Sequence, residues 1–440
     1  MEKYYHSVTL DKEKCRGCTN CIKRCPTEAI RVREGKARII GERCIDCGEC
    51  IRVCPYHAKI ALTDPLASIQ KFPYKIALPA PALYGQFRNV SINAILTGLL
   101  KLGFDEVFEV ARGADYVTEF VNEAIKDPKR KKPIISSACP AIVRLIQVRF
   151  PELIDNIINI ESPMEIAARL AKEEFCRKMG VKEKDVGAFF ITPCAAKMTS
   201  IRNPIGIDRS WVDGAISILE IYGPLYNQIS RLEDDEVLLQ KASPHGILWA
   251  NSGGESSALD MDNYLAVDGI QNVIRVLEEI EDEKLTDLEF FEGLACTGGC
   301  VGGPLVFENG FVAKNRIRKL SEQAKGRHLS REEVVDAKEK IQWYFEKPIL
   351  PKPVMKLDDD ITLAMKKMEA IERIYEGLPG LDCGSCGSPS CRTHAEDIVR
   401  GYASEMDCVF KLREKVKELA QQMIELSEKI PGGKTSNNGK

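Results

Sequence analysis

Short apolar runs alternate with amphipathic stretches over most of the middle of this chain. The intervening stretches have the apolar spacing of helices, as in Ile92–Leu102 and Glu165–Met179. Strands that alternate with helices indicate an α/β region with parallel sheets, which bind ligands beyond the carboxyl ends of their strands. The runs that predict strands are Lys75–Leu78, Val107–Val110, Ile134–Ser137, Gly187–Thr192 and Gly246–Ala250.

The pattern changes toward both ends of the chain. Near the N-terminus, short strands such as Ala37–Ile40 separate loops. After residue 350, Pro351-Lys352-Pro353 and the acidic run Asp358–Asp360 mark a linker, and Ile361–Glu376 is predicted to be a helix.

Farther on, apolar residues recur with alternating spacings of three and four. This heptad pattern predicts a helix over 411–430 that pairs with a second helix or packs on its own domain. A coiled coil here would make the protein a homodimer or pass a signal through the helix. The apolar positions are Val409, Leu412, Val416, Leu419, Met423, Leu426 and Ile430.

Composition narrows the class of protein. The 440 residues suffice for several domains, and 44% hydrophobic and 29% charged residues are typical of a soluble globular protein. A net charge of −3 gives no support for a nucleic-acid or membrane partner. No apolar run approaches the roughly 18 residues that span a bilayer, and Met1–His6 lacks a secretory apolar stretch. We expect a cytoplasmic protein.

The 17 cysteines are the most informative residues. Eight precede residue 55, four are Cys139, Cys194, Cys296 and Cys300, four lie between 383 and 408, and Cys176 remains without a role. Four sets of four match the ligand number of cubane iron–sulfur clusters. Disulfides are the alternative, but C-x2-C spacings in a chain of cytosolic type favour metal binding.

The first 66 residues carry one cysteine pattern twice. It runs Cys15-x2-Cys18-x2-Cys21-x3-Cys25-Pro and repeats from Cys44. This is the pattern of bacterial two-cluster ferredoxins, in which the fourth cysteine of each run binds the other cluster. A zinc ribbon would leave cysteines unexplained, so we predict two electron-transfer 4Fe–4S clusters. Their ligands are Cys15, Cys18, Cys21 and Cys54 for one, and Cys44, Cys47, Cys50 and Cys25 for the other.

A third cysteine pattern, Cys383-x2-Cys386-x4-Cys391-x16-Cys408, follows the linker. It resembles the small four-cysteine 4Fe–4S domain of corrinoid iron–sulfur proteins and of some membrane electron-transport subunits. Zinc is the alternative metal, because four cysteines alone do not decide it. His394 lies within this motif and is expected on the surface of a helix.

The remaining four cysteines stand in unusual local sequences. Cys296 and Cys300 lie one helical turn apart in a glycine-rich stretch, and glycines let the backbone approach a bulky group. Cys139 and Cys194 each follow a predicted strand. Cys139 also precedes Pro140 and a predicted helix, whose N-terminus favours a thiolate. We predict that these four cysteines hold one iron–sulfur site. Ser252–Glu255 is typical of a tight turn and only weakly of a phosphate loop.

The segments around these cysteines resemble the three signature segments of the FeFe-hydrogenase catalytic domain. The resemblance implies an H-cluster, which is a 4Fe–4S cubane joined to a diiron unit that carries CO, cyanide and a dithiolate bridge. It implies that Cys139, Cys194 and Cys296 hold the cubane and that Cys300 bridges to the diiron unit. Lys197 matches a lysine that hydrogen-bonds a cyanide, and Pro81 lies in a segment that packs against the diiron unit.

The same comparison reveals departures from productive family members. Ala138 stands where those members have the cysteine that shuttles protons, and Ser200 stands where they have a glutamate. Methionines that flank the diiron unit are replaced by Thr192 and Leu294. Glu119 and Glu123 are nearby candidates for relay acids. Retained metal ligands without a proton relay favour a sensor with low turnover over a high-flux enzyme.

The sequence therefore predicts a sensory FeFe hydrogenase with an α/β catalytic domain. Its implied partners are H2, protons, a redox partner such as ferredoxin, and a signalling kinase or phosphatase. The alternative is a hydrogenase-like iron–sulfur protein without a diiron site, similar to eukaryotic cluster-assembly proteins. The predicted segments are a ferredoxin-like domain at 1–66, the catalytic domain at 67–350, a 4Fe–4S domain at 351–410, the heptad helix at 411–430 and a disordered tail at 431–440.

Overall fold

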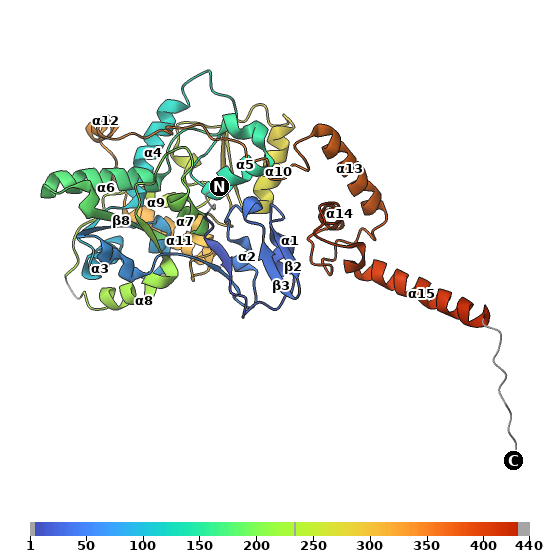
Figure 1. Ribbon diagram of the computed structural model, residues 1–440. Helices are drawn as coiled ribbons and strands as arrows, with labels where there is room; N and C mark the ends of the chain where they lie inside the picture. Colours follow the sequence, from blue (N-terminus) through green and yellow to red (C-terminus); the bar gives the residue numbers. More distant parts are fainter. Residues whose placement is uncertain (1–4, 233–234, 430–440) are drawn as a thin grey trace, which may run out of the picture. The chain divides into compact units, whose positions relative to one another are not determined.

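The computed structural model describes residues 5–232 and 235–429, which form two compact units (Figure 1). The larger unit contains the described residues of Met1–Lys14 and Ile40–Met355. The smaller unit contains those of Cys15–Ile39 and Lys356–Lys440. No helix among the described residues is both long and apolar enough to cross a bilayer.

A four-stranded parallel sheet forms the centre of the larger unit. Its strand order is β6 (Glu106–Val107), β5 (Tyr74–Pro79), β8 (Val186–Thr192) and β9 (Gly214–Ser217). The strands predicted at Lys75–Leu78 and Gly187–Thr192 are thereby confirmed. The parallel pairing that we expected from the alternation of strands and helices is also present.

A second parallel sheet has the order β10 (Tyr264–Asp268), β11 (Phe290–Leu294) and β7 (Ile134–Ile135). The strand predicted at Ile134–Ser137 is therefore present but shorter. The strands β1 (Val8–Leu10) and β4 (Lys59–Ala61) form a separate antiparallel pair.

The helices of the larger unit cover these sheets. Residues of α4 and α6 share one core with Ile76 and Leu78, whereas residues of α3, α8 and α11 share another core with Ala77. Successive residues of β5 thus face opposite cores, as expected for a parallel sheet that is buried on both faces. The α-helices are α2 (Glu49–Arg52), α3 (Ile92–Lys101), α4 (Val110–Ala124), α5 (Pro140–Arg149), α6 (Pro163–Met179), α7 (Ala195–Arg202), α8 (Ile218–Ile229), α9 (Pro244–Leu248), α10 (Ile270–Glu281), α11 (Gly310–Gln323) and α12 (Arg331–Lys340).

Two strand predictions are wrong in whole or in part. The run Gly246–Ala250 lies mostly in helix α9, which begins after Ser243. The Ser243 hydroxyl accepts hydrogen bonds from the backbone of His245 and Gly246, and Pro244 occupies the first turn. These capping features decide between helix and strand where a short apolar run cannot. The run Val107–Val110 divides between β6 and α4.

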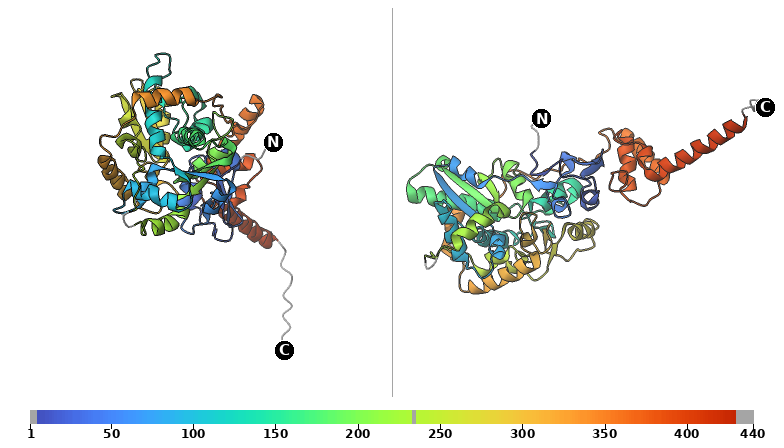
Figure 2. Two further views of the ribbon diagram at one scale, coloured as in Figure 1. Left: turned by 90° about the vertical axis from the view of Figure 1, so that its left-hand side faces the viewer. Right: turned by 90° about the horizontal axis from the view of Figure 1, so that it is seen from below.

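The smaller unit combines α1 (Asn20–Arg24), the antiparallel pair β2 (Ile30–Arg33) and β3 (Lys36–Ile39), α13 (Ile361–Glu376), α14 (Cys391–Val399) and α15 (Val409–Lys429). The predicted helix 361–376 is confirmed, and the heptad stretch lies in α15. Figure 2 shows α15 extending away from α13 and α14. Its heptad side chains from Val409 to Leu426 are each at least 41% exposed. Ile430 and the predicted tail lie outside the described residues.

Candidate functional site

Three of the four cysteines lie within four residues of the end of a parallel strand. Cys194 comes after β8, Cys139 after β7, and Cys296 after β11. Cys300 begins a short 3-10 turn, Cys300–Gly302, in the same glycine-rich loop as Cys296. Ligand sites in open parallel sheets lie at this edge, beyond the carboxyl ends of the strands.

A cavity of about 100 Å³ joins these residues. All four cysteines line it, together with Lys197, Ala138 and Pro81. The structure thus brings together every residue that the sequence predicted for this site. Glu119 and Glu123 do not line it, because they are exposed on α4 and face a different cavity.

Helix starts hold two of the thiols. Cys139 is the N-cap residue of α5, with Pro140 in the first turn as predicted. Cys194 is the N-cap residue of α7, and its backbone N–H donates a 3.0 Å hydrogen bond to the hydroxyl of Thr192. Lys197 lies in the first turn of α7, so this short helix fixes a thiol and an ammonium group together.

The glycines of the cysteine loop are needed for close packing against backbone. A Cβ on Gly299, whose φ is +96°, would lie 2.6 Å from the backbone nitrogen of Ser252. A Cβ on Gly303 would lie 2.3 Å from the carbonyl oxygen of Pro193. Real Cβ atoms do not approach backbone this closely, so the loop can close over the cavity only with glycine at these positions.

Burial controls the protonation of the thiols. It raises the pKa of Cys194 to about 12 and also raises the pKa of Cys296 and Cys300, with neighbouring thiols adding to the effect. In the absence of metal these thiols are therefore neutral. Positively charged iron reverses the balance, because metal binding drives thiols to the thiolate.

The ammonium group of Lys197, which lines the cavity, forms no ion pair with any described residue. Burial lowers its pKa, and among the described residues no acceptor lies within hydrogen-bonding distance of its ammonium group. An anionic ligand in the cavity would supply that acceptor. This donor set, four thiols and one ammonium, fits a cubane with an attached unit that carries cyanide.

The second cysteine loop of the N-terminal segment reaches the same cavity. Cys47 lines it. Nη1 of Arg52, at the end of α2, donates hydrogen bonds of 3.3 Å to Sγ of Cys296 and to the carbonyl of Gly302. No sequence pattern indicates this contact, because no spacing motif connects residues 244 positions apart.

Two buried glutamates, Glu255 and Glu292, also line the cavity. The Ser136 hydroxyl donates a 2.6 Å hydrogen bond to Glu255. Glu292 accepts hydrogen bonds from the backbone of Gly253 and from both the backbone and the hydroxyl of Ser256. Burial, together with the negative charge of Glu292, raises the pKa of Glu255 to about 8, so that the two glutamates hold a proton between them at neutral pH.

Sequence reasoning missed this glutamate pair. Ser252–Glu255 is a turn, as predicted, but a turn alone gives no reason to expect acid–base chemistry. Glu292 is an acidic residue within the apolar strand β11, and all five residues of this strand are buried. A charged residue in a buried strand is rare unless it has a partner. The position of Glu292 in an apolar run was therefore the one feature of the sequence that could have indicated this pair.

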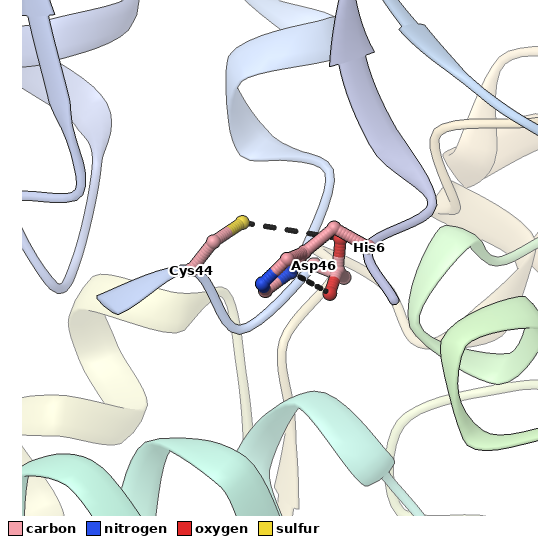
Figure 3. Close-up of side chains that lie close together, drawn as sticks. All are labelled: His6, Cys44 and Asp46. Carbon is pink, nitrogen blue, oxygen red and sulfur yellow. Dashed lines mark hydrogen bonds and ion pairs between the residues drawn. The ribbon is translucent and has the colours of Figure 1, made fainter. Parts of the chain in front are cut away.

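Asp46 organises the second cysteine loop (Figure 3). It accepts hydrogen bonds from His6 at 2.9 Å and from the backbone of Val8 at 3.0 Å, and Sγ of Cys44 lies 3.9 Å from it. The ligand atoms of His6, Cys44 and Asp46 are close enough to share a metal ion. Because Cys44 is already a predicted cubane ligand, we assign Asp46 to loop structure instead.

The C-terminal cysteine motif forms a compact core with α13 and α14. Cys391 and Cys408 are buried, and burial raises the pKa of Cys386, with the charge of Cys408 adding to the effect. The expectation for His394 is wrong, because its side chain is buried, with 1% exposure. Neither ring nitrogen has a hydrogen-bond partner among the described residues.

Family models of known proteins match the three cysteine-containing regions of the chain. The family model described as "Iron only hydrogenase large subunit, C-terminal domain" matches residues 74–263 and 255–304, which together are more than half of the chain. The chain belongs to the FeFe hydrogenase family. A 4Fe-4S dicluster model matches residues 7–55 and an Fe-S cluster model matches residues 378–410 of this family member. The predicted family and fold class are confirmed.

Three relatives illustrate the range of the FeFe hydrogenase family. Iron hydrogenase 1 of Clostridium pasteurianum is 26% identical over 369 residues, covering 68% of this chain and 64% of the relative. The periplasmic [Fe] hydrogenase large subunit of Nitratidesulfovibrio vulgaris is 32% identical over 212 residues, covering 44% and 50%. The cytosolic Fe-S cluster assembly factor nar1 of Aspergillus flavus is 26% identical over 160 residues, covering 36% and 27%. The chain spans less than two thirds of the length of each.

Proposed function

We propose that this protein is a sensory FeFe hydrogenase of the cytoplasm. It binds H2 at an H-cluster and slowly and reversibly oxidises it to two protons and two electrons. The observation that carries this proposal is the single cavity that joins four thiols and an unpaired ammonium group, with alanine at the proton-relay position. Three further 4Fe–4S clusters exchange the electrons with a redox partner such as ferredoxin.

The residues that line the cavity would have different roles in binding the cofactor. Cys139, Cys194 and Cys296 would hold the cubane, and Cys300 would bridge to the diiron unit. When bound, the H-cluster supplies the redox-active iron and the amine base between which H2 is cleaved. Lys197 donates a hydrogen bond to an anionic ligand in the cavity. Apolar side chains such as Phe190 and Trp249 line the cavity as well and limit the entry of water.

Proton transfer is the step for which the site is poorly equipped. The methyl group of Ala138 cannot carry a proton, and loss of a positioned acid or base costs on the order of 10²–10⁴ in rate. Glu255 is the substitute that the cavity offers, since a group with a pKa near the working pH transfers protons best. A less direct path through Glu255 is consistent with slow turnover.

Electrons, unlike protons, have a direct route between the cavity and the ferredoxin-like segment. Cys47 lines the same cavity as Cys139 and Cys296, and Arg52 bonds to Cys296 directly. A cluster held by the second cysteine loop would therefore lie next to the catalytic site. Slow chemistry with direct electron exit suits a sensor, whose output is the redox state of its clusters. The exposed heptad face of α15 would deliver this state to a second copy and to a signalling kinase or phosphatase.

Infrared spectroscopy of protein matured with a diiron complex tests the proposal. We expect sharp CO and cyanide bands that shift on addition of H2 or CO. As a matched pair, Lys197→Met should shift the cyanide bands, whereas Lys319→Met on α11 should not. A silent spectrum, with all iron accounted for by cubanes, would contradict the proposal.

The second candidate is an iron–sulfur protein of the hydrogenase family that never carries a diiron unit. The similarity to nar1 of Aspergillus flavus supports it. Lys197 favours the first candidate, because its ammonium group lines the cavity without an ion-pair partner among the described residues and could donate to an anionic ligand of a diiron unit. The infrared experiment separates the two candidates directly.

A further inference from the structure

Two cysteine loops of the smaller unit touch each other. Gly384, between Cys383 and Cys386, adopts a φ of +77°, and a Cβ there would lie 3.0 Å from Cε of Lys23 and 3.5 Å from Cδ1 of Ile22. Ile22 and Lys23 directly follow Cys21 in α1. The C-terminal cysteine motif thus packs against the helix that carries a predicted ligand of the first ferredoxin cluster.

A buried charge cluster fixes this contact. Asp397, on α14, accepts hydrogen bonds from Nε and Nη2 of Arg31 at 2.6 and 3.0 Å, and from Nη2 of Arg33 at 3.1 Å. The Ser388 hydroxyl adds a fourth, at 2.8 Å. The side chains of Arg31 and Asp397 are only 7% and 4% exposed. A two-point arginine–carboxylate contact fixes orientation as well as distance.

Backbone contacts extend the interface along β2. The N–H of Val32 donates to the carbonyl of Gly387 at 2.8 Å, and Nη1 of Arg33 donates to the carbonyl of Cys386 at 2.7 Å. Gly387 has a φ of +79°, and a Cβ there would lie 1.9 Å from the carbonyl oxygen of Val32. The C-terminal loop therefore covers one edge of β2 at a distance that no side chain permits.

We infer that the C-terminal four-cysteine site holds a 4Fe–4S cluster that exchanges electrons directly with the cluster of the Cys15–Cys25 loop. In the transfer, one electron leaves the reduced cluster of that loop and enters the oxidised C-terminal cluster. No bond and no proton is involved. Zinc cannot take this role, because it has no redox chemistry in proteins.

Three cations of the ferredoxin-like loop lie at the contact. Lys23, Arg31 and Arg33 all face the C-terminal motif from the ferredoxin side. The terminal helix α15 begins directly after Cys408, and the N–H of Leu412 donates to the Cys408 carbonyl at 2.9 Å. The last cluster thus adjoins the element that we propose as the output.

This inference goes beyond the proposed hydrogenase function and does not depend on it, because any low-potential reductant can supply the electron. The full chain is reconstituted with iron and sulfide, analysed for iron, sulfide and zinc, and reduced with dithionite. Electron paramagnetic resonance then detects magnetic coupling between neighbouring reduced clusters. A Cys391→Ser variant identifies which part of the spectrum belongs to the C-terminal cluster.

We expect the C-terminal cluster to show broadened, fast-relaxing signals from its neighbour. Gly387→Ala should abolish this coupling, whereas Gly401→Ala should preserve it. Gly401 has a similar φ of +77° but no neighbour within 4 Å of its Cβ position. Asp397→Asn, which keeps the side-chain volume, should weaken the magnetic coupling. If Gly387→Ala fails to assemble the C-terminal cluster, the coupling in Asp397→Asn tests the inference instead. Zinc at the site, an uncoupled wild-type signal, or coupling unchanged in both interface variants would overturn the inference.

Discussion

The guanidinium of Arg52 lies 3.3 Å from Sγ of Cys296 and donates a hydrogen bond to it. The other side of the same guanidinium is held by Glu49, at 2.5 and 3.2 Å. A residue of the ferredoxin-like segment thereby touches a predicted ligand of the catalytic cubane. The contact places a fixed positive charge where an electron arrives or leaves.

Replacing this charge should change the reduction potential of the cubane. The reduced cluster carries one more negative charge than the oxidised one, so Arg52 stabilises the reduced state more. We expect Arg52→Gln to lower the midpoint potential by ~40 mV, for a differential interaction of about 1 kcal/mol. A spectroelectrochemical titration measures this shift. Arg38→Gln is the control, because Arg38 makes an exposed ion pair with Glu34. An upward shift or none would contradict the assignment.

Glu255 should govern the pH dependence of H2 evolution. Its pKa is raised to about 8 by burial and by Glu292, so the carboxyl is protonated below that pH and can donate. The wild-type rate of H2 evolution should therefore fall as the pH rises through about 8. Glu255→Gln should lower the rate by roughly 10² and remove this pH dependence, since an amide cannot transfer the proton.

The control for Glu255→Gln is Glu119→Gln. Glu119 is exposed on α4 and does not line the cavity, although the sequence suggested it as a relay acid. Its substitution should leave the rate and the pH profile of H2 evolution unchanged. If Glu119→Gln had the larger effect, protons would enter from α4 and not through Glu255.

A thiol at position 138 should speed H2 production. Ala138 lines the cavity, and its backbone N–H donates to the Ser136 hydroxyl at 3.2 Å. A cysteine there, with a pKa near 8.5, can carry protons where alanine cannot. We expect Ala138→Cys to raise H2 production by up to roughly 10², and Ala138→Ser to give no comparable gain. Equal rates for the wild type and Ala138→Cys would mean that another step limits turnover.

The sequence predicted the four cysteines that line the cavity, because the chemistry of metal ligands restricts both residue type and local spacing. It also placed Cys139 and Cys194 after strands, since period and composition identify buried parallel strands. It could not reveal Arg52 beside Cys296 or Glu255 beside Glu292, because the sheets bring these residues together over long stretches of chain. The burial and the neighbours of these side chains depend on the tertiary fold and are not encoded in a local motif.

His394 shows the same limit in the smaller unit. By helical position alone it is a surface residue, but the segment that contains Arg31 and Arg33 packs over this part of α14 and buries it. Helix α9 is a different case, in which local capping by Ser243 was visible in the sequence but was outweighed by an apolar run. Long-range packing explains the error about His394. The error about α9 arose because the hydrophobic periodicity of a short apolar run does not distinguish a helix from a strand.

The exposed face of α15 should form a parallel two-stranded coiled coil with a second copy. Its heptads place Val409, Val416 and Met423 at one core position and leucines at the other, and β-branched residues with leucine favour dimers. Leu419→Ser and Met423→Ser should each remove roughly 2 kcal/mol of apolar burial from each helix and raise the dimer Kd by at least about tenfold. Sedimentation or light scattering of the full chain measures the mass. Gln421→Ser, on the outer face, should leave the mass unchanged. A wild-type monomer, or a dimer that tolerates both core substitutions, would rule out this helix as the dimer contact.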